Sequence, residues 1–363
     1  MSLKPSVYWL FVFIPITVVL EHMGHLPPPM IFFSAALAIV PIAALIVQST
    51  EQLSLRTGDA VGGLLNATFG NAPELIIATV ALRAGLLDMV RASLIGAILA
   101  NLLLALGLSF FLGGLRYRDQ NYNSLAARTY SSMMLIAVIS LLVPSTFSRI
   151  LAPESTIRQE QLLNIGIAVV LLVAYGLYLL FSLKTHPKAF ASVESEGDAH
   201  HHEGEQWSTA RAISSLVGAS VLAAWMSEIL VGAAEGTGKS LGMTQTFIGI
   251  VFLAIVGGAA ESGSAIAMGR KNKMDLSVGI ALGSSIQIAL FVAPALVLLS
   301  YFIAPQPLEL SFNRAETGSL FMGVLIGTLV CGNGQSNWYK GVQLVTVYTI
   351  IALMFYFIPG TAH

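Results

Sequence analysis

The chain has 363 residues, of which 55% are hydrophobic and only 10% are charged, and its mean hydropathy is +0.78. Soluble globular proteins carry about 25% charged residues, so this composition indicates a polytopic membrane protein. A formal net charge of −1 provides no basic surface for nucleic acid, and the single cysteine, Cys331, excludes an intramolecular disulfide framework.

The apolar runs divide the chain into candidate membrane spans. A span needs roughly 20 apolar residues, and lipid offers backbone groups no hydrogen-bond partners, so each run is expected to be a helix. The first run follows Lys4 and has no small-residue cleavage site after it, which favours a retained span. The predicted fold class is an all-α integral membrane protein with eleven transmembrane helices, at residues 6–24, 30–53, 58–82, 87–113, 129–150, 160–183, 210–235, 244–269, 275–303, 317–334 and 340–358.

One hydrophilic segment, residues 184–209, interrupts this pattern. It contains several acidic residues and the run His200, His201 and His202, with almost no large apolar side chains, so we expect a solvated linker. Short histidine-rich tracts also bind metals, which leaves a regulatory role open. The predicted domains are therefore an N-terminal helix with a short loop (1–29), a first repeat with spans 2–6 (30–183), the linker (184–209) and a second repeat with spans 7–11 (210–363).

From Thr57 onward, positions in the first half match positions in the second half without gaps when 187 is added to the residue number. Agreement at charged positions is less easily explained by chance than agreement at glycine or alanine, so we interpret the match as a duplication. Five spans in each repeat place the two copies in opposite orientations, which is the inverted-repeat architecture of many secondary transporters. The matched pairs include Thr57 and Thr244, Glu74 and Glu261, Arg83 and Arg270, Asp88 and Asp275, and Gly96 and Gly283.

Glu74 and Glu261 each lie deep in an apolar segment, at the ends of the pentapeptides Gly-Asn-Ala-Pro-Glu and Gly-Gly-Ala-Ala-Glu. A carboxylate in mid-membrane costs roughly 2.5 kcal/mol or more, so one that persists usually faces a cavity, a partner or an ion. Gly70, Pro73 and Gly257 favour local unwinding, which frees backbone carbonyls to face an ion. The pair predicts a shared cation site at the midplane.

Calcium is the ion that suits such a site. It takes six to eight oxygen ligands from carboxylates, carbonyls, amides and water, and two carboxylates cancel its charge. The polar residues near the two glutamates are predicted ligands or their hydrogen-bond partners, with plain interhelical hydrogen bonding as the alternative; they are Asn71, Asn101, Ser284, Ser285 and Gln287. Glu51 and Glu228, near the ends of spans 2 and 7, are predicted to guide protons or ions inward, unless they are ordinary interfacial carboxylates.

Lysine and arginine residues are unevenly distributed between the two sides of the predicted topology. Twelve fall on the side of the N-terminus and six on the other. By the positive-inside rule, the N-terminus and the linker are expected in the cytoplasm. The short termini favour a prokaryotic plasma membrane.

The chain resembles the calcium/proton exchangers of the cation exchanger family, within the calcium:cation antiporter superfamily. The resemblance is carried by Thr50 to Leu53, Gly62 to Glu74, Gly257 to Glu261 and Gly283 to Gln287, and it covers nearly the whole chain from about residue 30. It implies ten core helices plus an N-terminal one, with alternating access around a central site. It also implies that Glu74 and Glu261 are the principal ion carboxylates and that Asn71 is their polar neighbour.

Two residues depart from the usual family form. Gly258 stands where the family has asparagine, and Ser262 stands where it has histidine, which removes one candidate proton carrier. The resemblance implies Ca²⁺ and H⁺ as transported ions, no cofactor, and the lipid bilayer as the surroundings, while a homo-oligomer stays open.

We expect the two carboxylates to bind either one calcium ion or two protons, so that the ions compete. A sodium/calcium or other divalent cation exchanger is the main alternative, and the absence of a second acid beside either glutamate favours protons. A channel would not require two inverted halves. An intramembrane enzyme is a distant alternative, because the chain has no His-Glu-x-x-His zinc motif.

Overall fold

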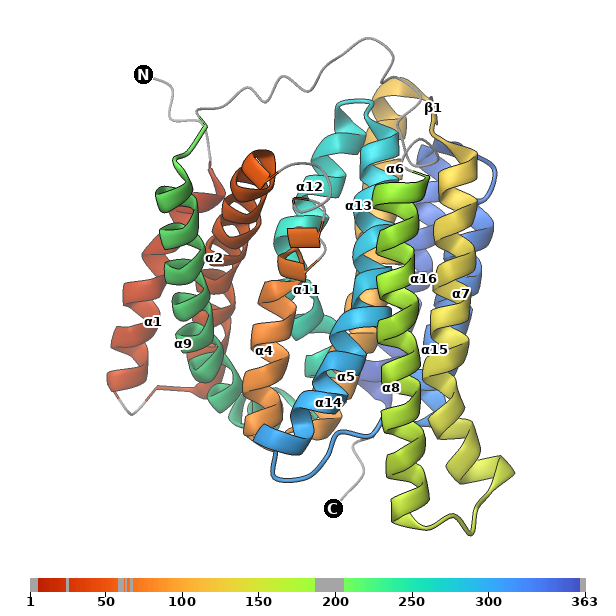
Figure 1. Ribbon diagram of the computed structural model, residues 1–363. Coiled ribbons are helices and arrows are strands. Elements are labelled where there is room, and N and C mark those ends of the chain that lie inside the picture. The colour runs from red at the N-terminus through yellow and green to blue at the C-terminus, as the bar shows by residue number, and fades with distance from the viewer. Residues whose placement is uncertain are drawn as a thin grey trace. The chain divides into compact units, whose positions relative to one another are not determined.

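The computed structural model describes residues 6–23, 26–57, 62, 64–65, 68–186 and 206–359, and the histidines predicted to belong to the linker lie outside these ranges. The described chain is almost entirely helical (Figure 1). Its helices are α1 (Phe13–His22), α2 (Pro28–Thr57), α4 (Ala72–Arg83), α5 (Leu87–Leu99), α6 (Leu106–Tyr117), α7 (Ser124–Thr146), α8 (Ile157–Leu180), α9 (Thr209–Leu241), α10 (Gln245–Phe247), α11 (Ala254–Gly257), α12 (Ala259–Arg270), α13 (Met274–Gln287), α14 (Ala293–Ile303), α15 (Arg314–Cys331) and α16 (Trp338–Phe357).

Shorter turns continue or join these helices. A 3-10 turn, Val7–Val12, precedes α1. The π-helical turns are Ala100–Ala105 between α5 and α6, Phe147–Leu151 after α7, Phe181–Thr185 after α8, Ile248–Leu253 between α10 and α11, and Ile288–Val292 between α13 and α14.

Eight helices among the described residues are long and apolar enough to cross a membrane, which makes the chain an integral membrane protein. They are Pro28–Thr57, Leu87–Tyr117, Ser124–Thr146, Ile157–Thr185, Thr209–Leu241, Met274–Ile303, Arg314–Cys331 and Trp338–Phe357. A ninth would be the pair Gln245–Gly257 and Ala259–Arg270, broken at Gly258. Since Val7–His22 and α4 are shorter, the count of eleven spans stays a prediction.

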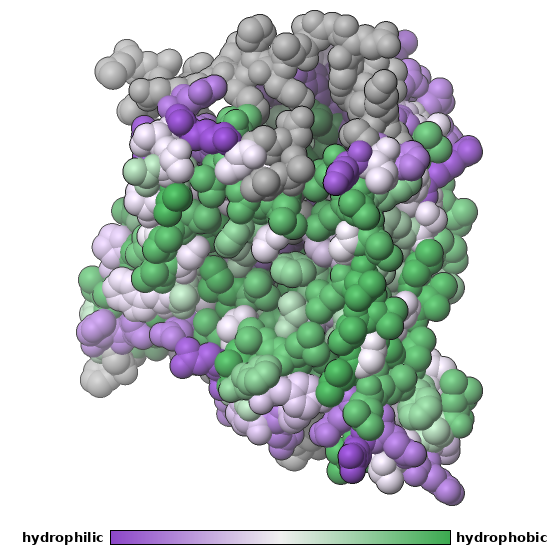
Figure 2. All heavy atoms as spheres, viewed as in Figure 1, coloured by the Kyte–Doolittle hydropathy of each residue, from purple (hydrophilic) through white to green (hydrophobic). Residues whose placement is uncertain are grey.

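The described residues form two compact units, each built from both halves of the sequence. The first unit comprises residues 1–96, 207–260 and 355–363, and the second comprises 97–206 and 261–354. On the face drawn in Figure 2, apolar side chains cover the middle lengths of the helices and hydrophilic ones gather toward their ends, as expected of helices that lie in lipid.

The core of the first unit lies between α2 and α9, which run side by side (Figure 1). Phe32, Ile39 and Ile46 of α2 are fully buried there with Met226 and Leu230 of α9. Helix α4 contributes to the same core through its buried apolar residues. The first unit therefore holds α4 and the residue Glu74 within a packed apolar core.

Glycines allow a close backbone crossing in the same unit. A Cβ on Gly96 of α5 would overlap the backbone of Ile250, and one on Gly249 would lie 2.7 Å from the carbonyl oxygen of Met89. Small residues of this kind let membrane helices approach closely.

In the second unit, α7 packs against α13 and α15, and α8 packs against α14. Leu99 and Leu102 press against Gly323 and Gly327 of α15, where any larger side chain would collide with them. Two three-residue strands, β1 (Asp119–Asn121) and β2 (Gln335–Asn337), pair antiparallel, a small departure from the predicted all-α fold. The strands lie in the short connections from α6 to α7 and from α15 to α16.

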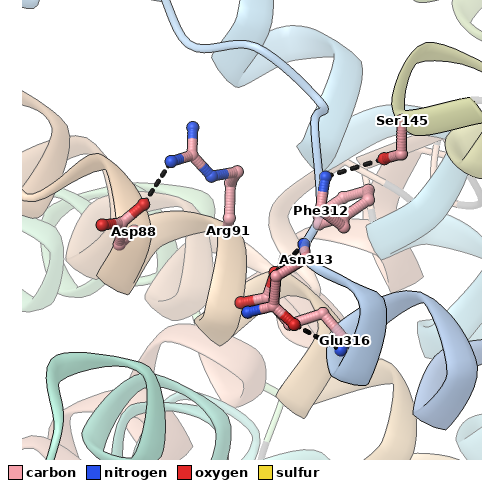
Figure 3. Close-up of polar contacts among 6 residues, drawn as sticks. All are labelled: Asp88, Arg91, Ser145, Phe312, Asn313 and Glu316. Carbon is pink, nitrogen blue, oxygen red and sulfur yellow. Dashed lines mark hydrogen bonds and ion pairs between the residues drawn. The ribbon is translucent and has the colours of Figure 1, made fainter. Parts of the chain in front are cut away.

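An extended segment between α14 and α15 is fixed inside the second unit. Leu308, Leu310 and Phe312 are fully buried, and their amides donate to Ser300 Oγ at 2.8 Å, Asn164 Oδ1 at 2.9 Å and Ser145 Oγ at 2.7 Å. Helix α15 then begins with a capping box in which Asn313 and Glu316 bond each other's backbone amides (Figure 3). Side chains thus satisfy these buried amides where regular structure is absent.

Several element boundaries repeat at the sequence offset of 187. Helix α4 spans Ala72–Arg83 and α12 spans Ala259–Arg270, while α5 and α13 begin at Leu87 and Met274. Gly85 (φ 77°) and Asn272 (φ 63°), which lie between these helices in each half, both have positive φ. The π-helical turns at Ala100–Ala105 and Ile288–Val292 also correspond. Positions that match in sequence at this offset thus have similar local structure.

Candidate ion-binding site

Glu74 is a buried carboxyl group without a hydrogen-bond partner among the described residues. It lies in the first turn of α4, is 8% exposed, and both of its carboxylate oxygens are inaccessible to solvent. A buried, unpaired polar group costs about 1–3 kcal/mol and a charged one costs more. The side chain therefore has open coordination capacity that a proton or a cation would satisfy.

The chain around Glu74 forms the break that the glycines predict. Gly70 and Asn71 lie in a buried turn, and Asn71 precedes α4 with φ −96° and ψ 25°, a non-helical conformation. Asn71 is 1% exposed and its side chain does not cap the helix. Pro73 occupies the first turn, where its missing amide proton costs nothing. The helix thus begins two residues before Glu74, and its dipole favours an ionised carboxylate there.

Gly257, from the other half of the sequence, packs directly against Glu74 in the first unit. A Cβ at position 257 would lie 3.0 Å from Glu74 Cγ and 3.6 Å from its carboxyl carbon. Gly257 ends α11, and the next residue, Gly258, leaves helical geometry with φ −80° and ψ 8°. The absence of a side chain at Gly257 leaves room for the Glu74 carboxyl group.

Glu261 lies in the first turn of α12 and belongs to the second unit. It is half-buried, and the residue after it takes part in a polar cluster. Ser262 Oγ donates to Asn101 Oδ1 at 3.4 Å, and Asn101 Nδ2 donates to Ser284 Oγ at 2.9 Å. Asn101 and Ser284 are 2% and 4% exposed. The second unit thus places three neutral polar side chains beside the helix turn that bears Glu261.

Two other predicted ligands, Ser285 and Gln287, differ in burial and in their position on α13. Ser285 is fully buried, and its hydroxyl donates to the Ala281 carbonyl oxygen at 2.9 Å within α13. Gln287 is half-buried and ends α13, directly before a π-helical turn. Asn101 and Ser284 thus share a hydrogen bond between two helical segments, whereas Ser285 bonds within its own helix.

The predicted access residues are exposed. Glu51 lies on α2, and Glu228 lies on α9 at the wall of a cavity of about 410 Å³ in the first unit. Arg83 and Glu235 line the same cavity, and Glu235 forms an ion pair with Lys239 at 2.7 Å. The sequence suggested no link between Arg83 and Glu228, because the cavity depends on how α4 packs against α9.

The matched aspartates act as local anchors. Asp88 pairs with Arg91 one turn along α5 (Figure 3). Asp275 accepts a hydrogen bond from the Asn123 amide at 2.6 Å, a backbone partner that the sequence did not suggest. Equivalent sequence positions therefore use different partners.

These features define a helical membrane transporter with carboxylates at breaks in its helices. The sodium/calcium exchanger protein family model matches residues 28–184 and 211–357, and the chain belongs to this family. It is 40% identical over 364 residues to the "Ca(2+)/H(+) antiporter" of Aphanothece halophytica, covering 97% of this chain and 96% of that protein. It is 39% identical over 344 residues to the "Ca(2+)/H(+) antiporter ChaA" of Bacillus subtilis (strain 168), covering 94% and 96%.

A solved structure titled "Structure of native YfkE" is also similar, with a TM-score of 0.84 and 36% identity over 97% of this chain and 100% of that one. The resemblance predicted from the motifs is confirmed. The chain is a secondary transporter, which removes the enzyme alternative.

Proposed function

We propose that this protein exchanges Ca²⁺ for H⁺ across a membrane by alternating access, with Glu74 and Glu261 as the carboxylates that bind either ion. The observation that carries the proposal is Glu74, whose two buried oxygens have no hydrogen-bond partner among the described residues. The similar proteins from Aphanothece halophytica and Bacillus subtilis are named as Ca²⁺/H⁺ antiporters, which supports these two substrates.

The ligands we assign to calcium come from both halves of the chain. Glu74 and Glu261 provide four oxygens and cancel the charge of the ion, and Asn71 adds a neighbouring amide. Carbonyl groups at the breaks near Gly70 and Gly257 provide further oxygens of the kind that Ca²⁺ prefers. We assign Asn101, Ser284, Ser285 and Gln287 as further ligands or as hydrogen-bond partners of ligands.

Coupling follows from competition for the same oxygens. A carboxylate must lose its proton before it binds a metal ion, so metal binding releases protons and proton binding releases metal. One calcium ion or two protons neutralise the pair equally well. The calcium-bound pair and the doubly protonated pair both avoid the cost of a buried net charge. The empty, ionised pair carries that cost, which suppresses movement of the unloaded carrier.

The architecture we propose for alternating access is two inverted repeats of five helices, at residues 30–183 and 210–363, preceded by an N-terminal helix within 1–29. The matching bounds of α4 and α12 support the duplication. We propose eleven spans and a cytoplasmic N-terminus, with the acidic and histidine-bearing linker (184–209) in the cytoplasm of a prokaryotic cell. The lysine and arginine distribution supports this orientation.

Glu228 and Glu51 are proposed to lead ions toward the centre. Glu228 lines a cavity that also borders Val80 of α4, two turns along the helix from Glu74. An exposed carboxylate in such a cavity raises the local concentration of cations.

Reconstitution of the purified protein in sealed vesicles tests the proposal. Uptake of labelled calcium is expected when a proton gradient is imposed and not when only a sodium gradient is imposed. Uptake driven by sodium alone would establish the sodium/calcium alternative, and a steady calcium current without counterflow would indicate a channel. Glu74→Gln and Glu261→Gln variants should both be inactive in the same vesicles.

A further inference from the structure

A second cavity, of about 590 Å³, lies in the second unit where α6 ends and α16 begins. Arg118, Asp119, Trp338, Tyr339 and Lys340 are among the residues that line it. None of them takes part in the proposed ion site. We propose that this cavity is a binding site for the phosphate headgroup of an anionic membrane lipid.

Charge is the first argument for an anionic ligand. The hydrogen bonds from Gln120 to Gly269 and Asn272, and from Arg128 to Gly332, join the segments 114–128, 269–277 and 331–343 at one end of the unit. These segments contain seven basic residues and two acidic ones, which are Arg116, Arg118, Arg128, Arg270, Lys271, Lys273 and Lys340 against Asp119 and Asp275. Asp275 is already engaged by the Asn123 amide. Basic pockets at the ends of membrane helices bind anionic headgroups.

The two basic residues that line the cavity differ in whether their side-chain donors already form hydrogen bonds. Lys340 Nζ donates to Val330 O at 3.2 Å, Asn333 Oδ1 at 2.6 Å and Gln335 O at 2.6 Å, so its three donors are used to hold the turn before β2. No described residue accepts a hydrogen bond from the guanidinium of Arg118. Arg118 therefore has donors to offer a phosphate, and a guanidinium forms bidentate pairs with phosphate oxygens.

The backbone of Arg118 is held in a conformation that disfavours any residue with a side chain. Its φ of 61° and ψ of −78° are those of a strained γ-turn, and glycine adopts such angles most easily. The turn itself needs no arginine, because its contact with α6 is a backbone hydrogen bond from the Arg118 amide to Gly114 O at 2.9 Å. A strained arginine in a cavity wall is consistent with a binding role for its side chain.

Aromatic side chains place the cavity at the level of lipid headgroups. Trp338 and Tyr339 are 48% and 57% exposed and begin α16, a helix apolar enough to span the membrane. Tryptophan and tyrosine favour the membrane interface, where their rings meet acyl chains and their polar atoms meet headgroups. A soluble phosphate would gain nothing from these two rings, so we commit to a lipid.

The walls of the cavity are held rigidly before any ligand binds. A Cβ on Gly114 would overlap the backbone of Trp338, and one on Gly341 would overlap the backbone of Phe111. Helices α6 and α16 therefore meet backbone to backbone just beside the cavity. Asp119 and Asn337 are also paired across the two strands. A preorganised site loses little entropy when it binds a ligand.

Lipid titration of the purified full-length protein in neutral detergent tests the proposal. The thermal unfolding midpoint is measured while dioctanoyl phosphatidylglycerol, dioctanoyl phosphatidylcholine or inorganic phosphate is added. Saturable stabilisation by phosphatidylglycerol alone is expected. Equal stabilisation by phosphatidylcholine, or by inorganic phosphate, would overturn the proposal.

Matched variants distinguish a built site from diffuse charge. Arg118→Gln is expected to weaken the apparent affinity for phosphatidylglycerol about tenfold, the loss of one charge-assisted hydrogen bond. Arg116→Gln removes the same charge two residues away, outside the cavity lining, and should change the affinity by less than about twofold. Equal losses in the two variants would overturn the proposal.

Two further variants test whether a change in lipid binding could result from a folding defect. Arg118→Gly relieves the backbone strain, so it should unfold at the same temperature as wild type or higher without lipid, yet lose the response to phosphatidylglycerol. Asp119→Asn removes the acid of the cavity and should strengthen the affinity. An unchanged response in Arg118→Gly would contradict the assigned role of the arginine side chain.

Discussion

Gly257 and Glu74 are packed so closely that a methyl group at position 257 would lie 3.0 Å from Glu74 Cγ. The two residues come from different halves of the sequence, and each lies at a break in its helix. The close approach gives the glycine of the second motif a direct physical role, which is to leave space for the carboxylate of the first.

Gly257→Ala is therefore expected to displace the Glu74 carboxyl group and to impair transport. Overpacking costs about 1–3 kcal/mol, so the calcium concentration for half-maximal uptake should rise roughly 5- to 150-fold. The measurement is calcium uptake into vesicles as a function of calcium concentration. Gly218→Ala is the matched control, because a Cβ at position 218 of the same unit meets nothing within 4 Å. Similar effects of the two substitutions would contradict the packing argument.

Glu74→Gln should separate stability from transport. Removing an unpartnered buried charge is expected to raise the unfolding free energy of the calcium-free protein by roughly 1–3 kcal/mol. The thermal midpoint of the calcium-free protein should rise accordingly. Loss of the ligand should lower uptake by more than the roughly 10- to 100-fold typical of losing a partner of a metal ligand. Thermal unfolding with and without calcium provides the readout, since calcium should stabilise the wild type and not the variant. Glu154→Gln, at an exposed loop position, should behave as wild type.

The polar cluster beside Glu261 should show pairwise coupling. Asn101→Ala removes the hydrogen bonds to Ser284 and Ser262 and should cost about 1–3 kcal/mol of stability, because buried polar groups lose their partners. Ser262→Ala should cost less, since its bond is the longer one at 3.4 Å. A double-mutant cycle with Ser284→Ala measures the coupling energy of the shorter bond. Additive effects of Asn101→Ala and Ser284→Ala would show that the bond does not contribute.

Substitution of Ser145 is expected to lower the stability of the protein without changing its calcium transport. Its hydroxyl accepts the Phe312 amide at 2.7 Å, so Ser145→Ala leaves a buried amide without that partner (Figure 3). We expect a loss of about 1–3 kcal/mol of stability and no change in the calcium concentration for half-maximal uptake. Ser132→Ala, which removes a hydroxyl bonded only to its own helix at an exposed position, is the control. A changed calcium dependence in Ser145→Ala would mean that the extended segment influences the ion site.

Calcium affinity should depend steeply on pH. At pH values at which both carboxylates are protonated, two protons must leave before calcium binds. The calcium affinity should therefore fall up to about 100-fold for each unit decrease in pH. Where both are ionised, affinity should not depend on pH. Calcium binding to the purified protein, measured by calorimetry across a pH series, checks this. A slope of one proton per calcium in the wild type would show that only one carboxylate takes part.

The sequence predicted much of the helical organisation because apolar length and glycine or proline breaks are local properties. The helix breaks near Gly70 and Gly257 were predicted, and the structure has them. Two strands and the extended segment before α15 were not predicted, because their hydrogen-bond partners come from residues more than one hundred positions away. The pairing of Asp275 with the Asn123 amide was missed for the same reason.

The sequence by itself determined that this is a membrane protein, and it predicted a duplication with one acidic residue at each matched helix break. Those facts depend on composition and on the spacing of residues along the chain. Only the tertiary structure decided that Gly257 packs against Glu74, that Ser262 bonds Asn101, and that Arg118 faces a cavity with two aromatic residues. These relationships depend on how distant segments pack together, because side chains meet across helices whose mutual placement no single segment specifies.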